Sequence, residues 1–229
     1  MNFIVKYSAK LDLESYLIRI WKNTWVDYNN SNKEFFYRWA PKDFIDDLMA
    51  AKDKETAEDV VKQYWKNTFP PSFERDNEFL IDWFGRLLNE EKDLIIKRLE
   101  KAYDKPFPFD EITVYLTTCF GCPYYYEKRY FYIGRNYGFL GILNTARHEL
   151  NHFMFHYYFD DYIKEKSVSR ENKEYLKEAL TILTSGRKTE NEGRKAQILQ
   201  IEDFVKQNKN LPIKEIIDLV IENNFFADN

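Results

Sequence analysis

Apolar residues recur every three to four positions along most of this chain, which is the spacing of amphipathic helices with one buried face. The longest such segment, residues 77–103, carries its apolar stripe on Leu80, Phe84 and Leu87, among others. Prolines at 70–71 and at 106 and 108 interrupt the pattern, because proline does not continue a helix. The predicted helices are 13–25, 41–49, a segment from 54 to the breaker at 69–72, 77–103, 139–162, 173–184, 196–207 and 213–223.

The pattern changes after residue 108, where β-branched and aromatic residues become frequent. Residues 111–117 favour a strand, and 124–126 and 130–133 favour two more. Residues 134–138 contain two glycines and indicate a turn before the helix at 139. The predicted fold class is therefore α+β, mostly helical with a small antiparallel or mixed sheet. We expect an N-terminal helical region over 1–75, and a core with C-terminal helices over 76–229 that can pack with it as one domain.

Composition and charge narrow the class of protein. With 229 residues, 44% hydrophobic and 31% charged, the chain is expected to be globular rather than disordered. Its net charge of −4, and the lack of a basic stretch interleaved with aromatics, argue against nucleic acid as a partner. No apolar run approaches the roughly 18 residues of a membrane span, and the N-terminus does not have the pattern of a secretory signal. We therefore expect no membrane association and a cytoplasmic location.

All three histidines fall within nine positions, at His148, His152 and His156. The first two form an H-E-x-x-H motif with Glu149. Residues four apart lie on one helix face, about 6 Å apart, so two imidazoles can bind one zinc ion. The glutamate can then act on the zinc-activated water. On a helical wheel His148, Glu149 and His152 lie opposite an apolar side, which suggests that they face a cleft. The apolar side comprises Leu143, Ala146, Leu150, Phe153 and Tyr157.

A catalytic zinc ion usually has three protein ligands and one open position, so a third ligand is required. His156 lies a further turn along, about 12 Å from His148 on a regular helix, which is too far for both to reach one ion. Phe155 also occupies the place where a glycine would let the helix end and fold back. A carboxylate from the next helix is the other solution. Glu178 is the first candidate, with Glu174 and then Glu171 as alternatives.

The motif His148-Glu149-x-x-His152, followed by Glu178-Ala179-Leu180-Thr181, resembles the gluzincin clan of zinc metallopeptidases, which includes the thermolysin-like enzymes. The resemblance covers about 77–185 and implies a zincin-like core of backing helix, sheet, H-E-x-x-H helix and glutamate helix. It implies zinc bound by His148, His152 and Glu178, with Glu149 as general base. Lys177 and Ile182 depart from the thermolysin-like pattern, in which Asn and Asp occupy these places.

These residues predict a zinc-dependent peptidase that hydrolyses peptide bonds in a peptide or protein substrate. A second hydrogen-bond donor is normally required for the oxyanion that develops in the reaction. The candidates for it, which the sequence does not rank, are Tyr157, Tyr162, Tyr175 and Arg147. His156 is expected to support the site, to line its cleft or to lie at the surface, and Asp160 and Asp161 are candidates to orient the imidazoles. An extended substrate is expected to add to the sheet along 130–133 or 111–117.

Two alternatives to this function stay open. One is kinship to regulatory metallopeptidases that cleave repressors, although residues 1–75 show no convincing helix-turn-helix. The other is a non-catalytic zinc-binding or interaction protein.

The pair Cys119-x-x-Cys122 is the only other motif with possible chemistry. Such a pair can be a redox dithiol or half of a structural zinc site. The sequence has no second pair, and the segment follows a strand without opening an evident helix. We therefore interpret the two residues as ordinary thiols in a loop.

Overall fold

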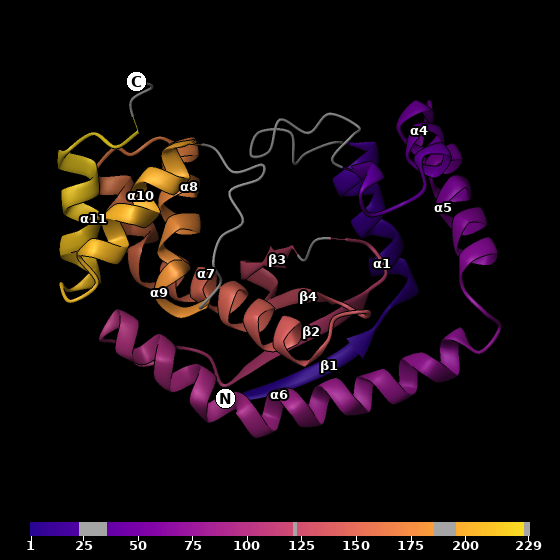
Figure 1. Cartoon of the computed structure of the whole chain (residues 1–229), viewed down its shortest axis with the longest axis horizontal. Helices are drawn as coiled ribbons and strands as arrows, with labels where there is room; N and C mark the ends of the chain where they lie inside the picture. Colours follow the sequence, from indigo (N-terminus) through magenta and orange to yellow (C-terminus); the bar gives the residue numbers. More distant parts are fainter. Residues whose placement is uncertain (23–35, 121–122, 186–195, 227–229) are drawn as a thin grey trace.

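The computed structural model describes residues 1–22, 36–120, 123–185 and 196–226. A four-stranded sheet with the order β1-β2-β4-β3 lies at its centre (Figure 1). The strands are β1 (Asn2–Tyr7), β2 (Glu111–Thr117), β3 (Tyr124–Tyr125) and β4 (Tyr130–Gly134). β1 and β4 both pair with β2 in parallel, whereas β3 pairs with β4 antiparallel. The predicted α+β class, mostly helical with a mixed sheet, is thereby confirmed.

The register of the strands decides which side chains share a face of the sheet. Val5 is level with Val114, Val114 with Phe131, and Phe131 with Tyr124. Because side chains of a strand alternate between faces, Tyr124 and Tyr125 must point to opposite faces. Tyr124 shares the face of Val114 and Phe131, which belong to the larger hydrophobic core.

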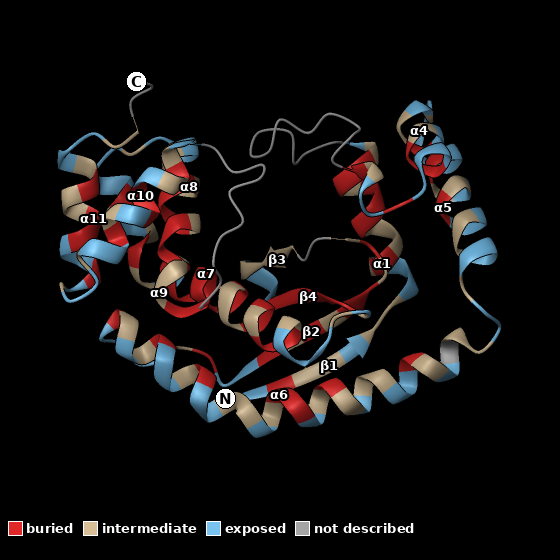
Figure 2. Ribbon diagram, in the orientation of Figure 1, coloured by how far each residue is buried: buried red, intermediate tan, exposed pale blue. Residues whose placement is uncertain are grey.

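Two long helices cover this face. α6 (Phe73–Tyr103) runs beneath the sheet along the length of the molecule, and α7 (Phe139–Glu165) packs against both (Figure 1). α6 buries the side that faces the sheet, whereas the middle of α7 has no exposed residue between 145 and 156 (Figure 2). α6 is followed by Asp104, whose left-handed backbone (φ 49°) ends the helix before the prolines.

The remaining helices form groups at the two ends of the sheet (Figure 1). One group packs on α7 within the larger core and consists of α8 (Arg170–Leu180), α9 (Ile182–Ser185), α10 (Ala196–Gln207) and α11 (Ile213–Glu222). The other has a smaller core of its own and consists of α1 (Ala9–Tyr16), the π-helix η1 (Leu17–Trp21), α4 (Lys42–Ala50) and α5 (Lys54–Thr68).

Apart from shifts of a few residues at helix ends, the structure departs from the predicted elements in three places. The first hundred residues were expected to be mostly helical, yet Asn2–Tyr7 forms strand β1. The helix expected at 173–184 breaks at Thr181 into α8 and α9. The strand expected at 124–126 ends at Tyr125, because Tyr126–Lys128 turns into a 3-10 helix. The last residues predicted for the first helix, 23–25, lie outside the described residues.

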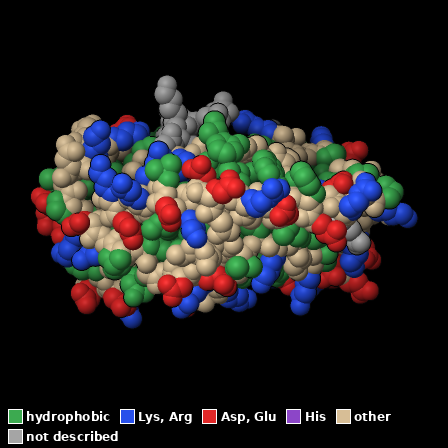
Figure 3. Space-filling view, turned by 90° about the horizontal axis from the view of Figure 1, so that it is seen from below, with side chains coloured by type: hydrophobic (Ala, Val, Ile, Leu, Met, Phe, Trp, Pro, Cys, Tyr) green, Lys and Arg blue, Asp and Glu red, His purple; other side chains and the backbone are tan. Residues whose placement is uncertain are grey.

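The surface on the α6 side mixes both signs of charge. Lysine and arginine side chains alternate there with aspartate and glutamate, and hydrophobic side chains lie between them (Figure 3). Among the described residues, no helix combines the length and the apolar character that crossing a bilayer requires.

Candidate metal centre

α7 presents the H-E-x-x-H motif and is buried on nearly all sides. Leu150 and Phe153 pack into the core as predicted. Contrary to the predicted separation of faces, His152 and Glu149 are also buried, with 1% and 5% of their surface exposed. Tyr157, expected in the core, is 53% exposed. The helix is enclosed because α8 covers the side that the wheel pattern assigned to a cleft.

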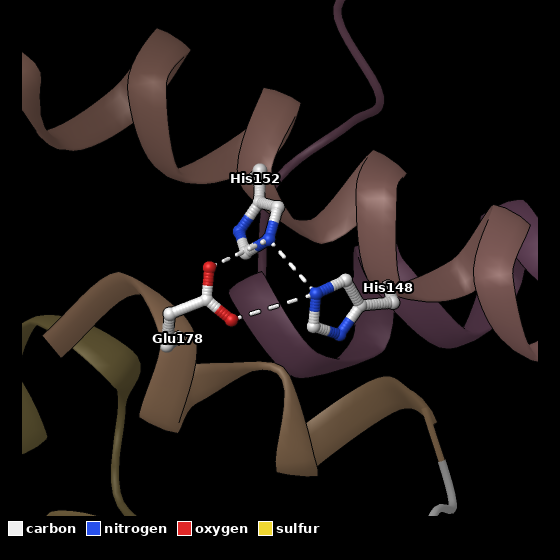
Figure 4. A group of neighbouring side chains, drawn as sticks. All are labelled: His148, His152 and Glu178. Carbon is white, nitrogen blue, oxygen red and sulfur yellow. Dashed lines mark hydrogen bonds and ion pairs between the residues drawn. The ribbon is translucent and has the colours of Figure 1, made fainter. Parts of the chain in front are cut away.

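α8 brings the third candidate ligand to α7. The helix begins after Ser169, whose hydroxyl accepts a hydrogen bond from the Asn172 amide at 3.2 Å. Glu178 lies in its last turn and turns its carboxylate to the two histidines (Figure 4). The alternatives on the same helix are engaged elsewhere, since Glu174 pairs with Lys177 and Glu171 accepts from Tyr175.

His148, His152 and Glu178 form a compact group of ligand atoms (Figure 4). The two histidine Nε2 atoms are 3.0 Å apart. Glu178 Oε2 lies 3.5 Å from His148 Nε2, and Glu178 Oε1 lies 3.3 Å from His152 Nε2. Ligands bonded tetrahedrally to zinc at about 2.0–2.1 Å are separated by roughly 3.3–3.4 Å. With one ligand atom from each residue, the three atoms lie within 4.8 Å of one another, so small side-chain adjustments would bring them to the spacing around one zinc ion, and their chemistry suits the ion.

Tyr124 of β3 is the neighbour of this group that sequence reasoning missed. Its ring lies on the imidazole of His152, with centroids 4.8 Å apart. Burial raises the pKa of its phenol, and the nearby carboxylates of Glu174, Glu178 and Glu149 raise it further. The phenol therefore stays protonated beside the ligand group. The alternation of a strand was a partial sequence signal for this position, because it places Tyr124 and Tyr125 on opposite faces but does not say which face meets α7.

His156 is not part of the ligand group. Its Nδ1 lies 2.9 Å from both oxygens of Asp160, and its Nε2 lies 2.7 Å from the Tyr124 hydroxyl. Asp160 also pairs with Lys173 at 2.7 Å. This agrees with a supporting position for His156, whereas Asp160 orients His156 rather than a candidate ligand. Asp161 is exposed.

The four candidates for the oxyanion donor lie elsewhere. Tyr162 donates to Asp218 on α11, and Tyr175 donates to Glu171 one turn back on α8. The exposed Tyr157 places its ring against Phe109. The hydroxyls of Tyr162 and Tyr175 therefore serve contacts between or within helices, and the Tyr157 ring packs on the segment before β2.

Arg147 also points away from the ligand group. It donates to Asn144 on the preceding turn of α7 at 3.1 Å. Burial lowers the pKa of its guanidinium, and Arg98 on α6 lowers it further. Arg147 therefore faces the backing helix rather than α8.

The two strands predicted to receive a substrate are both interior strands. β2 lies between β1 and β4, and β4 lies between β2 and the two-residue strand β3, so each has a neighbouring strand on both sides. Cys119 is buried in the smaller core, and Cys122 lies outside the described residues.

No protein-family model, curated protein or solved structure matches this chain.

Proposed function

We propose that this chain is a zinc-dependent peptidase of gluzincin type, with zinc held by His148, His152 and Glu178. The observation that carries the proposal is the closeness of the three ligand groups, which each offer one ligand atom within 4.8 Å of the other two. Glu178 comes from the next helix, 26 residues after His152, so its place beside the two histidines is not a local consequence of helix geometry.

Zinc bound at this group would supply Lewis-acid chemistry, acidifying a water molecule and polarising a carbonyl oxygen. The chain itself would supply the proton transfers. Glu149 follows His148 directly and is almost fully buried, so its carboxylate works in surroundings of low polarity. It would take a proton from the attacking water and pass it to the leaving amine of the peptide.

The structure also suggests where a substrate could lie. β3 is the edge strand next to the ligand group, because Tyr124 reaches from it to His152. Strand addition satisfies the backbone hydrogen bonds of an extended peptide. We therefore propose the edge of β3 for the substrate, in place of the interior strands predicted from the sequence.

Measuring zinc content and peptide hydrolysis together tests the proposal. We expect about one zinc ion per chain, and cleavage of some members of a broad peptide library. Glu149→Gln should keep the zinc but lose about 10²–10⁴-fold in hydrolysis, because the general base is removed. Glu178→Gln should lose zinc. Glu165→Gln is the matched control, because it removes an exposed carboxylate at the end of α7, the helix of Glu149. It should change neither the zinc content nor the rate of hydrolysis.

Two outcomes would contradict the peptidase. If the wild-type protein takes up no zinc from a buffer with excess metal, the proposed zinc centre is wrong, and the peptidase with it. A chain that binds zinc through these residues but cleaves nothing in the library would favour the non-catalytic alternative.

A further inference from the structure

A continuous chain of polar contacts lies beside the ligand group and joins three elements. Asp160 and His156 of α7 are 2.9 Å apart, and His156 Nε2 is 2.7 Å from the Tyr124 hydroxyl of β3. Lys177 of α8 donates to the same hydroxyl at 2.5 Å and pairs with Glu174. The side chains of His156 and Lys177 are only 11% and 4% exposed, so these contacts are largely shielded from water.

The direction of each hydrogen bond in this chain follows from its members. A lysine ammonium only donates, so the Tyr124 oxygen accepts from Lys177. The single phenol proton is then donated to His156, whose Nε2 must be the acceptor. The remaining ring nitrogen therefore carries the proton and donates to the Asp160 carboxylate. All of these bonds are satisfied by one arrangement of protons, and the arrangement requires the hydroxyl of Tyr124.

This series of polar contacts meets the ligand group at two points. The ring of Tyr124 lies on the ring of His152, at 4.8 Å between centroids and 31° between planes. Lys177 directly precedes Glu178 on α8. One side chain therefore contacts a ligand on α7 through its ring, and holds the residue next to the ligand on α8 through its oxygen.

We infer that Tyr124, held by His156 and Lys177, is a positioning residue that sets the spacing of α7 and α8 and so the fit of the three ligands to zinc. The inference rests on the proposed function, because it requires that zinc binds there. Supporting partners of this kind typically change metal affinity by about 10–100-fold. Tyr124 acts on the ligands and needs no contact with the substrate.

The test is zinc affinity, measured by competition with a chromogenic chelator on the full chain. Tyr124→Phe keeps the ring but removes the hydroxyl, and should weaken zinc binding about 10–100-fold. Lys177→Met should weaken it to a similar degree. If both act through the same bond, the double variant should be little worse than either single one. The visible spectrum of the cobalt(II)-loaded protein should also shift in Tyr124→Phe, since ligand geometry changes.

Tyr126→Phe is the matched control. The Tyr126 ring lies 5.0 Å from His156 by centroids, but its hydroxyl is not part of the contact chain. Zinc affinity and the cobalt spectrum should be unchanged in this variant.

The outcomes separate this inference from the proposed function. Suppose that the wild type binds zinc, and that the zinc affinities of Tyr124→Phe and Lys177→Met are both within twofold of it. The inference is then wrong, while the zinc centre stands. Equal losses in Tyr124→Phe and Tyr126→Phe would also overturn it. If the wild type binds no zinc, both fail. Should Tyr124→Phe not fold, Lys177→Met alone decides.

Discussion

At the scale of single residues, Asn151 shows how the ligand helix is fixed from behind. It lies between the two motif histidines in the sequence, but its side chain contacts other helices. Tyr103 of α6 donates to the Asn151 amide oxygen at 2.8 Å, and the Asn151 amide donates to Thr184 of α9 at 2.9 Å. Asn151 is completely buried. Its amide also donates to the Leu180 carbonyl at 3.4 Å, so this residue ties α7 to α6, to the end of α8 and to α9.

The first prediction concerns this contact. Tyr103→Phe should lower the free energy of unfolding by about 1–3 kcal/mol, because it removes a buried donor and leaves the Asn151 oxygen without it. Urea unfolding measures the change. Tyr158→Phe removes a comparable hydroxyl, which donates to the Pro106 carbonyl at 2.6 Å at an exposed position. That control should stay within about 0.5 kcal/mol of the wild type. Equal losses in the two variants would contradict the assigned role of burial.

The contrast between Glu178 and Tyr124 shows what the sequence could predict at this scale. The spacing of His148 and His152 follows from helix geometry, and Glu178 follows from the need for a third ligand on the next helix. The position of Tyr124 depends on the pairing of β3 with β4, which brings it to a helix that starts 15 residues later. No local spacing reports such a register, so the sequence left Tyr124 out of the candidate site.

At the scale of elements, the periodicity predicted the helices well, and the errors lie where tertiary contacts decide. β1 is six residues long, and a short run such as Phe3-Ile4-Val5 cannot be assigned to a strand by periodicity alone. It becomes a strand because it pairs with β2 along its whole length. α7 was predicted as amphipathic but is enclosed, because α8 packs over its second side.

The second prediction concerns the contact of α7 with α11. Asp218 accepts a hydrogen bond from Tyr162 and pairs with Lys214 at 3.3 Å and Lys166 at 3.4 Å. Burial raises the pKa of Asp218, but the hydrogen bonds from Tyr162, Lys214 and Lys166 outweigh it and lower the pKa below its usual value. A carboxyl with a lowered native pKa stabilises the fold above its unfolded pKa, near 4, and loses that contribution as the pH falls through the native value.

Asp218→Asn should therefore be less stable than the wild type near neutral pH, and the difference should shrink as the pH falls below about 4. Urea unfolding of the chelator-treated protein across this range measures it without a contribution from zinc. Asp203→Asn removes an exposed carboxylate on α10 and should show no such trend. A difference for Asp218→Asn that is constant with pH, or grows towards acid, would contradict the argument.

At the scale of the whole molecule, the chain is tied together across its length. The N-terminal strand β1 belongs to the same sheet as β4, and the Phe3 backbone exchanges two hydrogen bonds with the Asn89 side chain of α6, at 3.0 and 2.9 Å. Asp12 on α1 accepts from the hydroxyls of Thr117 and Thr118 at the end of β2. The boundary near residue 75 stays a prediction, but the sheet crosses it.

The last prediction follows from that crossing. A fragment of residues 76–229 lacks β1, so the edge of β2 loses its partner and the apolar surface that Phe3 and Val5 cover is exposed. We expect the fragment to unfold without a cooperative transition or to aggregate, and to bind zinc much more weakly than the full chain. Joining residues 1–8 to residues 73–229 through a short flexible linker should restore both properties. A short linker suffices because the rings of Tyr7 and Phe73 lie 5.7 Å apart by centroids. Thermal unfolding followed by circular dichroism, with zinc titration, compares the three proteins. If the 76–229 fragment alone unfolds cooperatively and binds zinc like the full chain, then β1 is dispensable and the candidate metal centre is stabilised by α6, α7 and α8 without it.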